Sequence, residues 1–532
     1  MTHPGEARAR VLVVGGGPVG MLLAAELAAL GTEVVLVEHR TTTSDRPKAT
    51  TLHARTVQCL ARRGHLPDHL ARAGGDANTM PFHFAGIPGL AITAPPTEPQ
   101  PVLKLPQAEL ERHFEGRARA AGARVLRGHR VVGLDRTPEG VRVEARGPRG
   151  TVTLHGRYAV GADGARSTVR RLAGIESDTW PATATALMGQ VRLRDEHARL
   201  LPPGWHRTPR GWLVVKDAAD GSTHLRTLNC DRPPADRERP VTLAELSQEV
   251  SYLAGHDITL TEGRWLSRFS DFSRLARTFR AGPVLLAGDA AHVHFPVGGQ
   301  GLSTGLLDAV SLGWRLALAA AGDAGDELLD TYDAERRPAA RRVVDNTRAQ
   351  VALMRPDPAL DPLRDLIAGM LTSGEDGGGA GGADGGRSGD RGRGGDAFGL
   401  MISAQDTVLP TRSPSSSWEG TFLRNVALDT ADGPTDVIRL LRGGRPLLLL
   451  LGEAGERHLG AARPWAHRLR VVRCAPVPDL PCEALLVRPD GYVGWAPDGG
   501  ALDAVLARCF GGRGVPDPPA ALAAAGPGQP TG

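Results

Sequence analysis

The chain has 532 residues, 41% of them hydrophobic and 23% charged, and a formal net charge of +4. This predicts a globular protein of about three domains, at roughly 150 residues per domain, with ample material to bury a cofactor. The 63 Lys and Arg residues are dispersed among 59 Asp and Glu residues, which argues against nucleic-acid binding, and no segment reaches the roughly 18 apolar residues of a membrane helix.

Cysteine spacing argues against a disulfide-stabilised protein and against a metal-binding one. The five cysteines show neither a disulfide framework nor CxxC or CxxH spacing, so we expect no metal site and a reduced compartment. Glu26 and several glycines interrupt the apolar run that could otherwise pass for a secretion signal. The expectation is a cytoplasmic protein, monomeric or homodimeric, with a small-molecule partner and no membrane or nucleic-acid partner.

Residues 10–40 predict a strand, a glycine turn, a helix and a second strand, VLVV, GGGPVG, MLLAAELAALG and EVVLVE. The glycines serve a tight turn, close approach of the backbone to a pyrophosphate, and packing of helix on strand. Glu38 ends the second strand, where it could accept hydrogen bonds from ribose hydroxyls. This pattern serves NAD or FAD equally well, and it nominates Gly15, Gly17, Pro18, Val19, Gly20, Glu38 and His39.

The next segments predict a discontinuous first domain. A helix in LPQAELERHFEGRARAAG and strands in RVLRG, VRVEAR and YAVGAD continue it to about residue 177. Residues 178–277 alternate like an antiparallel sheet, which can cover a ligand on one face, and we assign them to a substrate-binding domain. A buried strand at VLLAG and two long helices then return the chain to the first domain, which comprises 1–177 and 278–372.

The remaining sequence predicts a linker and a small C-terminal domain. Residues 373–397 are too rich in glycine to pack a core, and their GxGxxG at 377–382 is rejected because no strand precedes it and no helix follows. Residues 398–532 predict a thioredoxin-like α/β domain, without the CxxC of thioredoxin chemistry. The fold class is therefore α/β, a Rossmann-type domain with an inserted antiparallel sheet and a C-terminal α/β domain.

Further motifs carry a family resemblance. They are GPVLLAGDAAHVHFPVGGQGLSTGLLDAVSLGWRLA at 282–317, GADGARSTVRRLAGI from 161, RPKATTLHARTVQCL at 46–60 and LPQAELE at 105–111. In this order they resemble the FAD-dependent class A flavoprotein monooxygenases of the para-hydroxybenzoate hydroxylase type, over residues 10–350. VRPDGYVGW near the C-terminus resembles the subgroup of aromatic polyketide hydroxylases.

The resemblance implies roles for individual residues. Asp289, after Gly288, would bind a ribityl or ribose hydroxyl, Gln107 would lie near the ribityl chain, and Arg46 near the pyrophosphate or the nicotinamide nucleotide. Asp163 and Arg166 would support both FAD and the transient nicotinamide. The flavin ring itself would contact Pro296, Gly299, Gly301 and Leu302, the last two through backbone N–H groups.

Other readings of these residues stay open. Asp289 could instead be a helix N-cap, Arg46 a surface residue, Gln107 a helix-start residue and Arg166 a structural partner of Asp163. His292 and His294 are interpreted as packing and hydrogen-bonding residues in preference to an acid or base.

Three residues depart from the family pattern. Phe295 replaces a proline, Val297 a threonine and Ser303 an asparagine. With Gly298, the first two are the substrate-pocket candidates, and they should make that pocket more apolar. Ser303 should weaken a helix-start contact only slightly, because serine also caps helices.

The implied function is hydroxylation of a polycyclic aromatic polyketide in bacterial antibiotic biosynthesis. NADPH or NADH would reduce FAD, and dioxygen would give a flavin C4a-hydroperoxide as the oxygenating species. Two alternatives remain, Baeyer-Villiger oxygenation of a polyketide ketone or quinone and, less favoured, a non-catalytic flavoprotein. No general base is identified, since Tyr252 is the only tyrosine in the expected substrate domain.

Overall fold

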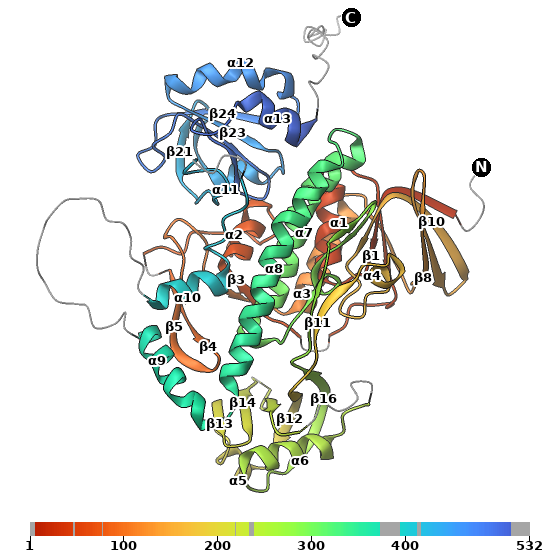
Figure 1. Cartoon of the computed structure of the whole chain (residues 1–532), viewed down its shortest axis with the longest axis vertical. Helices are drawn as coiled ribbons and strands as arrows, with labels where there is room; N and C mark the ends of the chain where they lie inside the picture. Colours follow the sequence, from red (N-terminus) through yellow and green to blue (C-terminus); the bar gives the residue numbers. More distant parts are fainter. Residues whose placement is uncertain are drawn as a thin grey trace, which may run out of the picture.

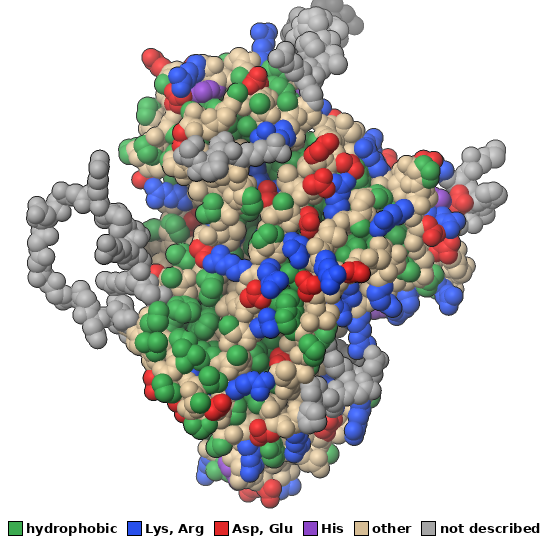
Figure 2. All heavy atoms as spheres, in the orientation of Figure 1, with side chains coloured by type: hydrophobic (Ala, Val, Ile, Leu, Met, Phe, Trp, Pro, Cys, Tyr) green, Lys and Arg blue, Asp and Glu red, His purple; other side chains and the backbone are tan. Residues whose placement is uncertain are grey.

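The computed structural model describes residues 6–45, 48–76, 78–218, 220–232, 239–372, 394–411 and 416–511. Figure 1 shows a C-terminal unit at the top, an antiparallel sheet at the bottom, and the long helices α7 and α8 running between them. On the face shown in Figure 2, Lys and Arg side chains are interspersed with Asp and Glu. No helix in the described part of the chain is long and apolar enough to cross a membrane.

The central sheet has eight strands, β1 (Glu6–Val14), β2 (Val34–Glu38), β7 (Arg124–Arg127), β8 (Arg130–Thr137), β9 (Gly140–Gly147), β10 (Gly150–Gly161), β18 (Arg280–Ala281) and β19 (Val284–Leu286). Their order is β18-β19-β10-β1-β2-β7, with β9 pairing β10 and β8 pairing β9. The run from β19 to β7 is parallel and its apolar residues are buried, as expected for a sheet covered on both faces. Strand β19 pairs with β10, so chain segments about 120 residues apart complete one sheet.

Helices α1 (Pro18–Ala29), α3 (Gln107–Ala120) and α7 (Gln300–Ala321) pack together, and α8 (Glu327–Met354) lies against α7. Val19 at the start of α1 is the contact point, because Cβ atoms built on Gly288 and Gly305 would each meet its side chain, at 3.1 and 2.7 Å. Small residues therefore let the two flavin-related motifs approach each other. Shorter helices α2 (Ala54–Arg62) and α4 (Thr168–Leu172) complete this unit.

The second large sheet is antiparallel, with the order β13-β14-β15-β12-β16. Its strands are β12 (Thr185–Leu193), β13 (Gly204–Thr208), β14 (Gly211–Asp217), β15 (Thr223–Asn229) and β16 (Leu260–Ser270). One face packs on α6 (Leu243–Ala254) through Leu187, Leu213 and Leu225. The opposite face presents Ala186, Trp212 and Leu228 toward the central unit, and α5 (Asp195–Ala198) lies at the edge.

Three small sheets join these units. They are β3 (Thr51–His53) with β6 (Val102–Lys104), β4 (Thr79–Phe84) with β5 (Ile87–Thr93), and β11 (Ser177–Trp180) with β17 (Ser273–Ala276) and β20 (His292–Val293). Helices α9 (Asp361–Thr372) and α10 (Gly394–Ser403) pack on β5. Because α10 begins at Gly394, residues 394–397 are helical, although the sequence analysis placed them in the linker. The rest of that linker, 373–393 with its glycine motif, lies outside the described residues.

The C-terminal unit has the sheet order β22-β21-β24-β23-β25-β26. Its strands are β21 (Ala427–Thr430), β22 (Gly433–Asp436), β23 (Leu447–Leu451), β24 (Arg470–Cys474), β25 (Ala484–Val487) and β26 (Val493–Trp495). Central β23 is parallel to β24 and antiparallel to β25, and helices α11 (Val437–Leu441), α12 (Leu459–Ala462) and α13 (Leu502–Phe510) complete a thioredoxin-like arrangement. All five cysteines are free thiols.

Buried ion pairs attach the C-terminal unit to α7 and α8. Arg488 contacts Glu335 of α8 at 2.9 Å and Asp490 at 2.5 Å, and Arg315 of α7 also pairs with Glu335. The Trp314 indole N–H donates to Asp490. Removing one member of such a network leaves the others as uncompensated buried charges. The VRPDGYVGW segment is therefore an attachment point to the helices that follow the flavin motif.

Candidate active site

The turn between β1 and α1 has the geometry of a dinucleotide-binding loop. Gly15 has φ of 110°, and a Cβ there or on Gly20 would collide with backbone carbonyl groups. A Cβ on Gly17, in contrast, would meet nothing within 4 Å. Helix α1 starts at Pro18 without a side-chain cap and without an acid in its first turn. Its first N–H groups can therefore bind an anionic phosphate.

Glu38 lies at the end of β2, as predicted. Its buried carboxylate accepts hydrogen bonds from the backbone N–H groups of Gly16 at 2.6 Å and Arg40 at 2.7 Å. The half-exposed His39 ring lies 3.0 Å from the same carboxylate. These contacts hold Glu38 beside the glycine turn, and a carboxylate has further lone pairs for a ribose hydroxyl.

Asp308 of α7 organises the second motif, and the sequence analysis missed it. Its buried carboxylate accepts hydrogen bonds from Gly288 N–H at 3.0 Å, His292 Nε2 at 2.7 Å and Arg336 Nε at 2.8 Å. Burial alone would raise the pKa of Asp308, but His292 and Arg336 outweigh burial and lower it. The signal in the sequence was a single acid within the apolar helical stretch GLLDAV. His292 is thus held as a structural hydrogen-bonding residue.

Asp289 differs from Asp308 in having no partner among the residues that the structure describes. Its side chain is exposed, and its carboxylate makes no hydrogen bond or ion pair to any residue that the structure describes. Desolvation by the surrounding protein raises the pKa of Asp289, while the charges of His292 and Lys48 lower it. The short helix Gly288–Ala290 has Ala287 at its N-cap position, so Asp289 is not that cap. The carboxylate is available to a ligand hydroxyl.

Lys48 is a second residue that the sequence analysis missed. Burial and Arg40 lower its pKa, while Glu111, Asp289 and Glu38 raise it, so this cation is close to acids from three elements of the site. The charges of Glu38 on β2 and of Asp289 both act on Lys48, so this cation could supply the counter-charge that a pyrophosphate needs. Its signal was rarity, since the chain has only three lysines. Arg46, the cation that was nominated, lies outside the described residues.

The start of α7 provides a second set of unpaired N–H groups. Gly299 is the N-cap at φ 64°, follows Pro296 and Gly298, and leaves the first turn without a side-chain cap. Gly301 and Leu302 lie in this turn. The His294 ring donates from Nδ1 to the Phe295 carbonyl, while its buried Nε2 lacks a partner among the described atoms.

The His294 ring lies beside the first turn of α7. A Cβ on Gly301 would lie 3.3 Å from His294 Nε2, and burial lowers the pKa of His294 to about 4, so the ring is neutral. Uncapped helical N–H groups next to an unpaired acceptor suit the donors and acceptors of a flavin pyrimidine edge. Together with the α1 turn, Glu38, Lys48 and Asp289, they fit a bound FAD.

The middle motif has a structural role. Asp163 accepts hydrogen bonds from the Ser167 hydroxyl at 2.5 Å and from the N–H groups of Thr168 at 2.7 Å and Val169 at 3.1 Å, which caps α4. Arg166 directly precedes Ser167, the N-cap of that helix. The backbone of Gln107 is fixed by a hydrogen bond to the Ala49 carbonyl. Nicotinamide or flavin contacts of these side chains stay predictions.

The substrate-pocket candidates lie between the α7 turn and the antiparallel sheet. Phe295 and Val297 are buried with Ala186, Trp212 and Leu228, and the rings of Phe295 and Phe269 are 5.5 Å apart. The adjacent Gly298 carbonyl accepts a hydrogen bond from His53 Nε2 at 2.8 Å. An apolar surface thus adjoins the segment that would contact the flavin.

Ser303 was expected to weaken a helix-start contact only slightly because serine also caps helices, but Ser303 does not cap α7. Gly299 is the N-cap of α7, and the Ser303 hydroxyl instead accepts the His53 N–H at 3.0 Å. The Ser303 carbonyl also accepts the Thr56 hydroxyl. Ser303 therefore fixes α7 to β3 and α2, because its side chain lies one turn beyond the cap.

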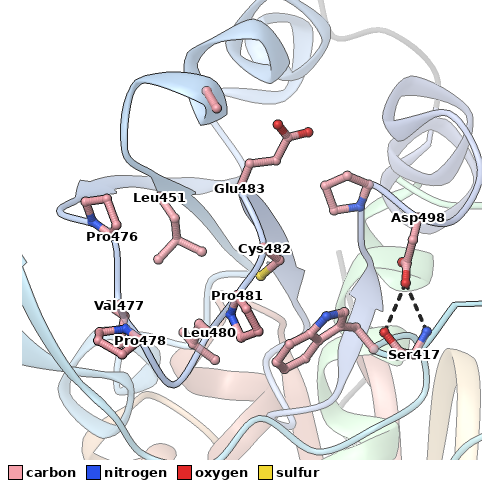
Figure 3. Close-up of a pocket in the computed structure, with 13 residues that line it drawn as sticks. Ser417, Leu451, Pro476, Val477, Pro478, Leu480, Pro481, Cys482, Glu483 and Asp498 are labelled. Carbon is pink, nitrogen blue, oxygen red and sulfur yellow. Dashed lines mark hydrogen bonds between the residues drawn. The ribbon is translucent and has the colours of Figure 1, made fainter.

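A separate pocket of about 780 Å³ lies in the C-terminal unit. Figure 3 shows Pro476, Pro481 and Cys482 around it, and the hydrogen bonds from Ser417 to Asp498 at its rim. Burial raises the pKa of Cys482 to about 11, so the thiol is protonated at neutral pH. None of its lining residues belongs to the elements that form the flavin-fitting site.

Comparison with known proteins agrees with this geometry. The family described as FAD binding domain matches residues 8–347, and the family described as aromatic-ring hydroxylase, C-terminal, matches residues 416–512. The 12-dehydrotetracycline 5-monooxygenase/anhydrotetracycline 6-monooxygenase of Streptomyces rimosus subsp. rimosus is 36% identical over 525 residues, 94% of this chain and 98% of that protein.

Two further proteins are similar over nearly the whole chain. The dialkyldecalin synthase of Streptomyces rugosporus is 34% identical over 505 residues, 94% of this chain and 98% of that protein. The crystal structure of an aromatic hydroxylase from angucycline biosynthesis superposes with a TM-score of 0.82 at 32% identity, over 95% of this chain and 99% of that one. The chain therefore belongs to the FAD binding domain family of flavoprotein monooxygenases and, within it, to the subgroup of aromatic polyketide hydroxylases.

Proposed function

We propose that this protein is an NADPH- or NADH-dependent monooxygenase that hydroxylates a polycyclic aromatic polyketide in bacterial antibiotic biosynthesis. The observation that carries the proposal is the position of the uncapped α7 turn, which adjoins the apolar surface formed by Phe295, Val297 and Phe269. FAD bound there would supply hydride acceptance from the nicotinamide and activation of dioxygen. The tetracycline and angucycline enzymes among its relatives support the substrate class.

The protein's own groups have three tasks in this proposal. The α1 turn, Lys48 and Asp289 hold the dinucleotide through N–H groups, a cation and a hydroxyl acceptor. The N–H groups at the start of α7 stabilise negative charge at the pyrimidine edge. Phe295 and Val297 keep water away from the reacting ring, which limits unproductive loss of activated oxygen.

Tyr252 does not serve as the missing general base. It belongs to α6, on the face of the antiparallel sheet opposite Trp212, and its hydroxyl donates to Asp231 at 3.2 Å. Its ring lies beneath the guanidinium groups of Arg210 and Arg232. Deprotonation of a phenolic substrate therefore does not depend on Tyr252.

The proposal is tested by following oxidation of NADPH and NADH by the flavin-loaded protein, with and without a panel of polycyclic phenols and quinones. A substrate that stimulates NADPH or NADH oxidation and yields a product heavier by one oxygen atom, about 16 Da, supports the monooxygenase. A lactone in place of a phenol would select Baeyer-Villiger oxygenation. A product of unchanged mass would favour a non-oxidative reaction, and a flavin that stays oxidised would remove the catalytic proposal.

We also propose the domain boundaries, the cellular compartment and the oligomeric state of the protein. We expect domain boundaries near residues 177, 278, 372 and 398, which limited proteolysis with mass spectrometry can locate. The protein is expected to be cytoplasmic and monomeric or homodimeric, which fractionation of the source cells and light scattering can test.

A further inference from the structure

Three cationic side chains gather on the side of the antiparallel sheet that faces the flavin-fitting unit. In the β14–β15 register, Val214 pairs with Arg226 and Lys216 pairs with His224, so Arg226 and Lys216 project from the same face. This is also the face of Trp212 and Leu228, which pack with Phe295 and Val297. The cations thus continue the apolar surface next to the α7 turn.

Lys104 reaches the same place from β6. Its Nζ donates to the Thr51 hydroxyl at 2.8 Å, and a Cβ on Gly299 would lie 3.2 Å from Thr51. Partial desolvation lowers the pKa of Lys104, and the charges of Lys216 and Arg226 lower it further. The central unit and the antiparallel sheet therefore each contribute charge to one cationic cluster, defined as Lys104, Lys216 and Arg226.

No acid in the described ranges compensates the charge of the cluster. Within the part of the chain that the structure describes, none of its three members forms an ion pair, although all three side chains are exposed. The arginines of neighbouring β16 are paired, Arg264 with Asp220 at 2.6 Å and Arg268 with Glu245 at 2.7 Å. Gathering like charges without a counter-ion costs free energy, so the arrangement calls for an anion.

The surrounding titratable groups do not supply that anion. Burial and Lys104 lower the pKa of His83 to about 4, and burial, Lys104 and His83 lower the pKa of His53 to about 4, so both rings are neutral. Burial, Arg226 and Lys216 also lower the pKa of His224. The charge of Asp220 opposes this effect on His224, but Asp220 is engaged by Arg264 and by the Ser222 hydroxyl and N–H.

An aromatic surface adjoins the cluster. The Phe82 and His83 rings are stacked 4.9 Å apart, His83 lies 4.4 Å from Trp205, and Trp205 lies 6.0 Å from Trp212. Lys104 Nζ is 5.6 Å from the Phe82 ring centroid. Flat rings prefer such a surface, while the cations prefer an oxygen anion.

We propose that Lys104, Lys216 and Arg226 form a recognition site for an anionic oxygen of a flat polycyclic phenol or enol, and so decide which polyketides this enzyme accepts. The inference rests on the proposed function and gives the ionisation state of its substrate. The O–H proton passes to solvent, and the oxygen anion is held by the three cations. An electron-rich anion is also the form that an electrophilic oxygen attacks most readily, which removes the need for a protein base.

The test uses oxidised, flavin-loaded protein without reductant, and two probes, alizarin (1,2-dihydroxyanthraquinone) and its dimethyl ether. Alizarin changes colour on ionisation, so its visible spectrum reports the bound form. We expect the anion spectrum at a pH where free alizarin is neutral, and binding about tenfold or more weaker in each of Lys104→Gln, Lys216→Gln and Arg226→Gln. The ether should bind the wild type and these variants alike.

The matched control is Arg142→Gln, which removes a positive charge from the exposed Arg142–Asp135 pair of β9. It should leave binding of both probes unchanged, and the flavin spectrum should confirm that every variant is folded. Bound alizarin that stays neutral, equal losses for phenol and ether, or no binding of either probe would overturn the proposal. Selective anion binding by a protein whose flavin stays oxidised when NADPH or NADH is added in the separate turnover assay would instead leave this site in place and remove the proposed function.

Discussion

Replacing Asp289 by alanine should separate ligand binding from stability. The carboxylate has no partner among the described residues, so the apoprotein loses no hydrogen bond in the Asp289→Ala variant. A hydrogen bond from a ligand hydroxyl to a charged acceptor contributes about 1.5–3 kcal/mol, so FAD should bind about tenfold to a hundredfold more weakly. Titration of the apoprotein with FAD, followed by flavin fluorescence, measures this change.

The stability of the same variant follows from the raised pKa of Asp289. An acid whose pKa is higher in the folded than in the unfolded protein binds more protons when folded, so its ionisation destabilises the fold as pH rises through the folded pKa. Removing it should leave the free energy of unfolding of the apoprotein in urea at pH 7 unchanged or slightly higher. A clear loss of apoprotein stability, with FAD affinity unchanged, would refute this account of Asp289.

Three further changes test other parts of the structure. Asp308→Asn should lower the free energy of unfolding in urea by about 3 kcal/mol, because Arg336 stays buried without its acid, and since the pKa of Asp308 is lowered, the difference should shrink as pH falls through that pKa. Gly17→Ala should leave thermal unfolding of the apoprotein unchanged but weaken FAD binding at least tenfold in a fluorescence titration. The added methyl group would meet no protein atom within 4 Å, but it would occupy the space expected for the pyrophosphate. Arg488→Met should cost about 3–5 kcal/mol in urea unfolding by leaving Glu335 without one of its two arginines, and a loss below about 1 kcal/mol would contradict the proposed attachment of the C-terminal unit.

The local parts of the site were predictable from the sequence. Gly15, Gly20 and Glu38 lie within one βαβ unit, so their spacing along the chain determines their spacing in the fold. The presence of an antiparallel sheet in the inserted segment followed from hydrophobic alternation, which is also a local signal, whereas the order of its strands did not. The second motif, with Gly288 and Asp289, was recognisable because its residues are also close together in the sequence.

The remaining features depend on pairings between distant segments. Asp308 of one helix accepts a hydrogen bond from Arg336 of another. The charge of Arg226 acts on Lys104 only because β6 and β15 belong to units that face each other. No periodicity within one segment encodes such pairings. The capping ability invoked for Ser303 does not apply, because the N-cap of the helix is a glycine in the left-handed region, which a propensity for capping side chains does not reveal.

The measurement that tests the central claim most directly is a turnover of the flavin-loaded enzyme with NADPH, a polycyclic phenol and dioxygen labelled with oxygen-18. The account predicts a hydroxylated product that carries one labelled oxygen atom, with formation that depends on both the reductant and the phenol. A product without the label, or consumption of NADPH that yields only hydrogen peroxide with every phenol in the panel, would contradict it.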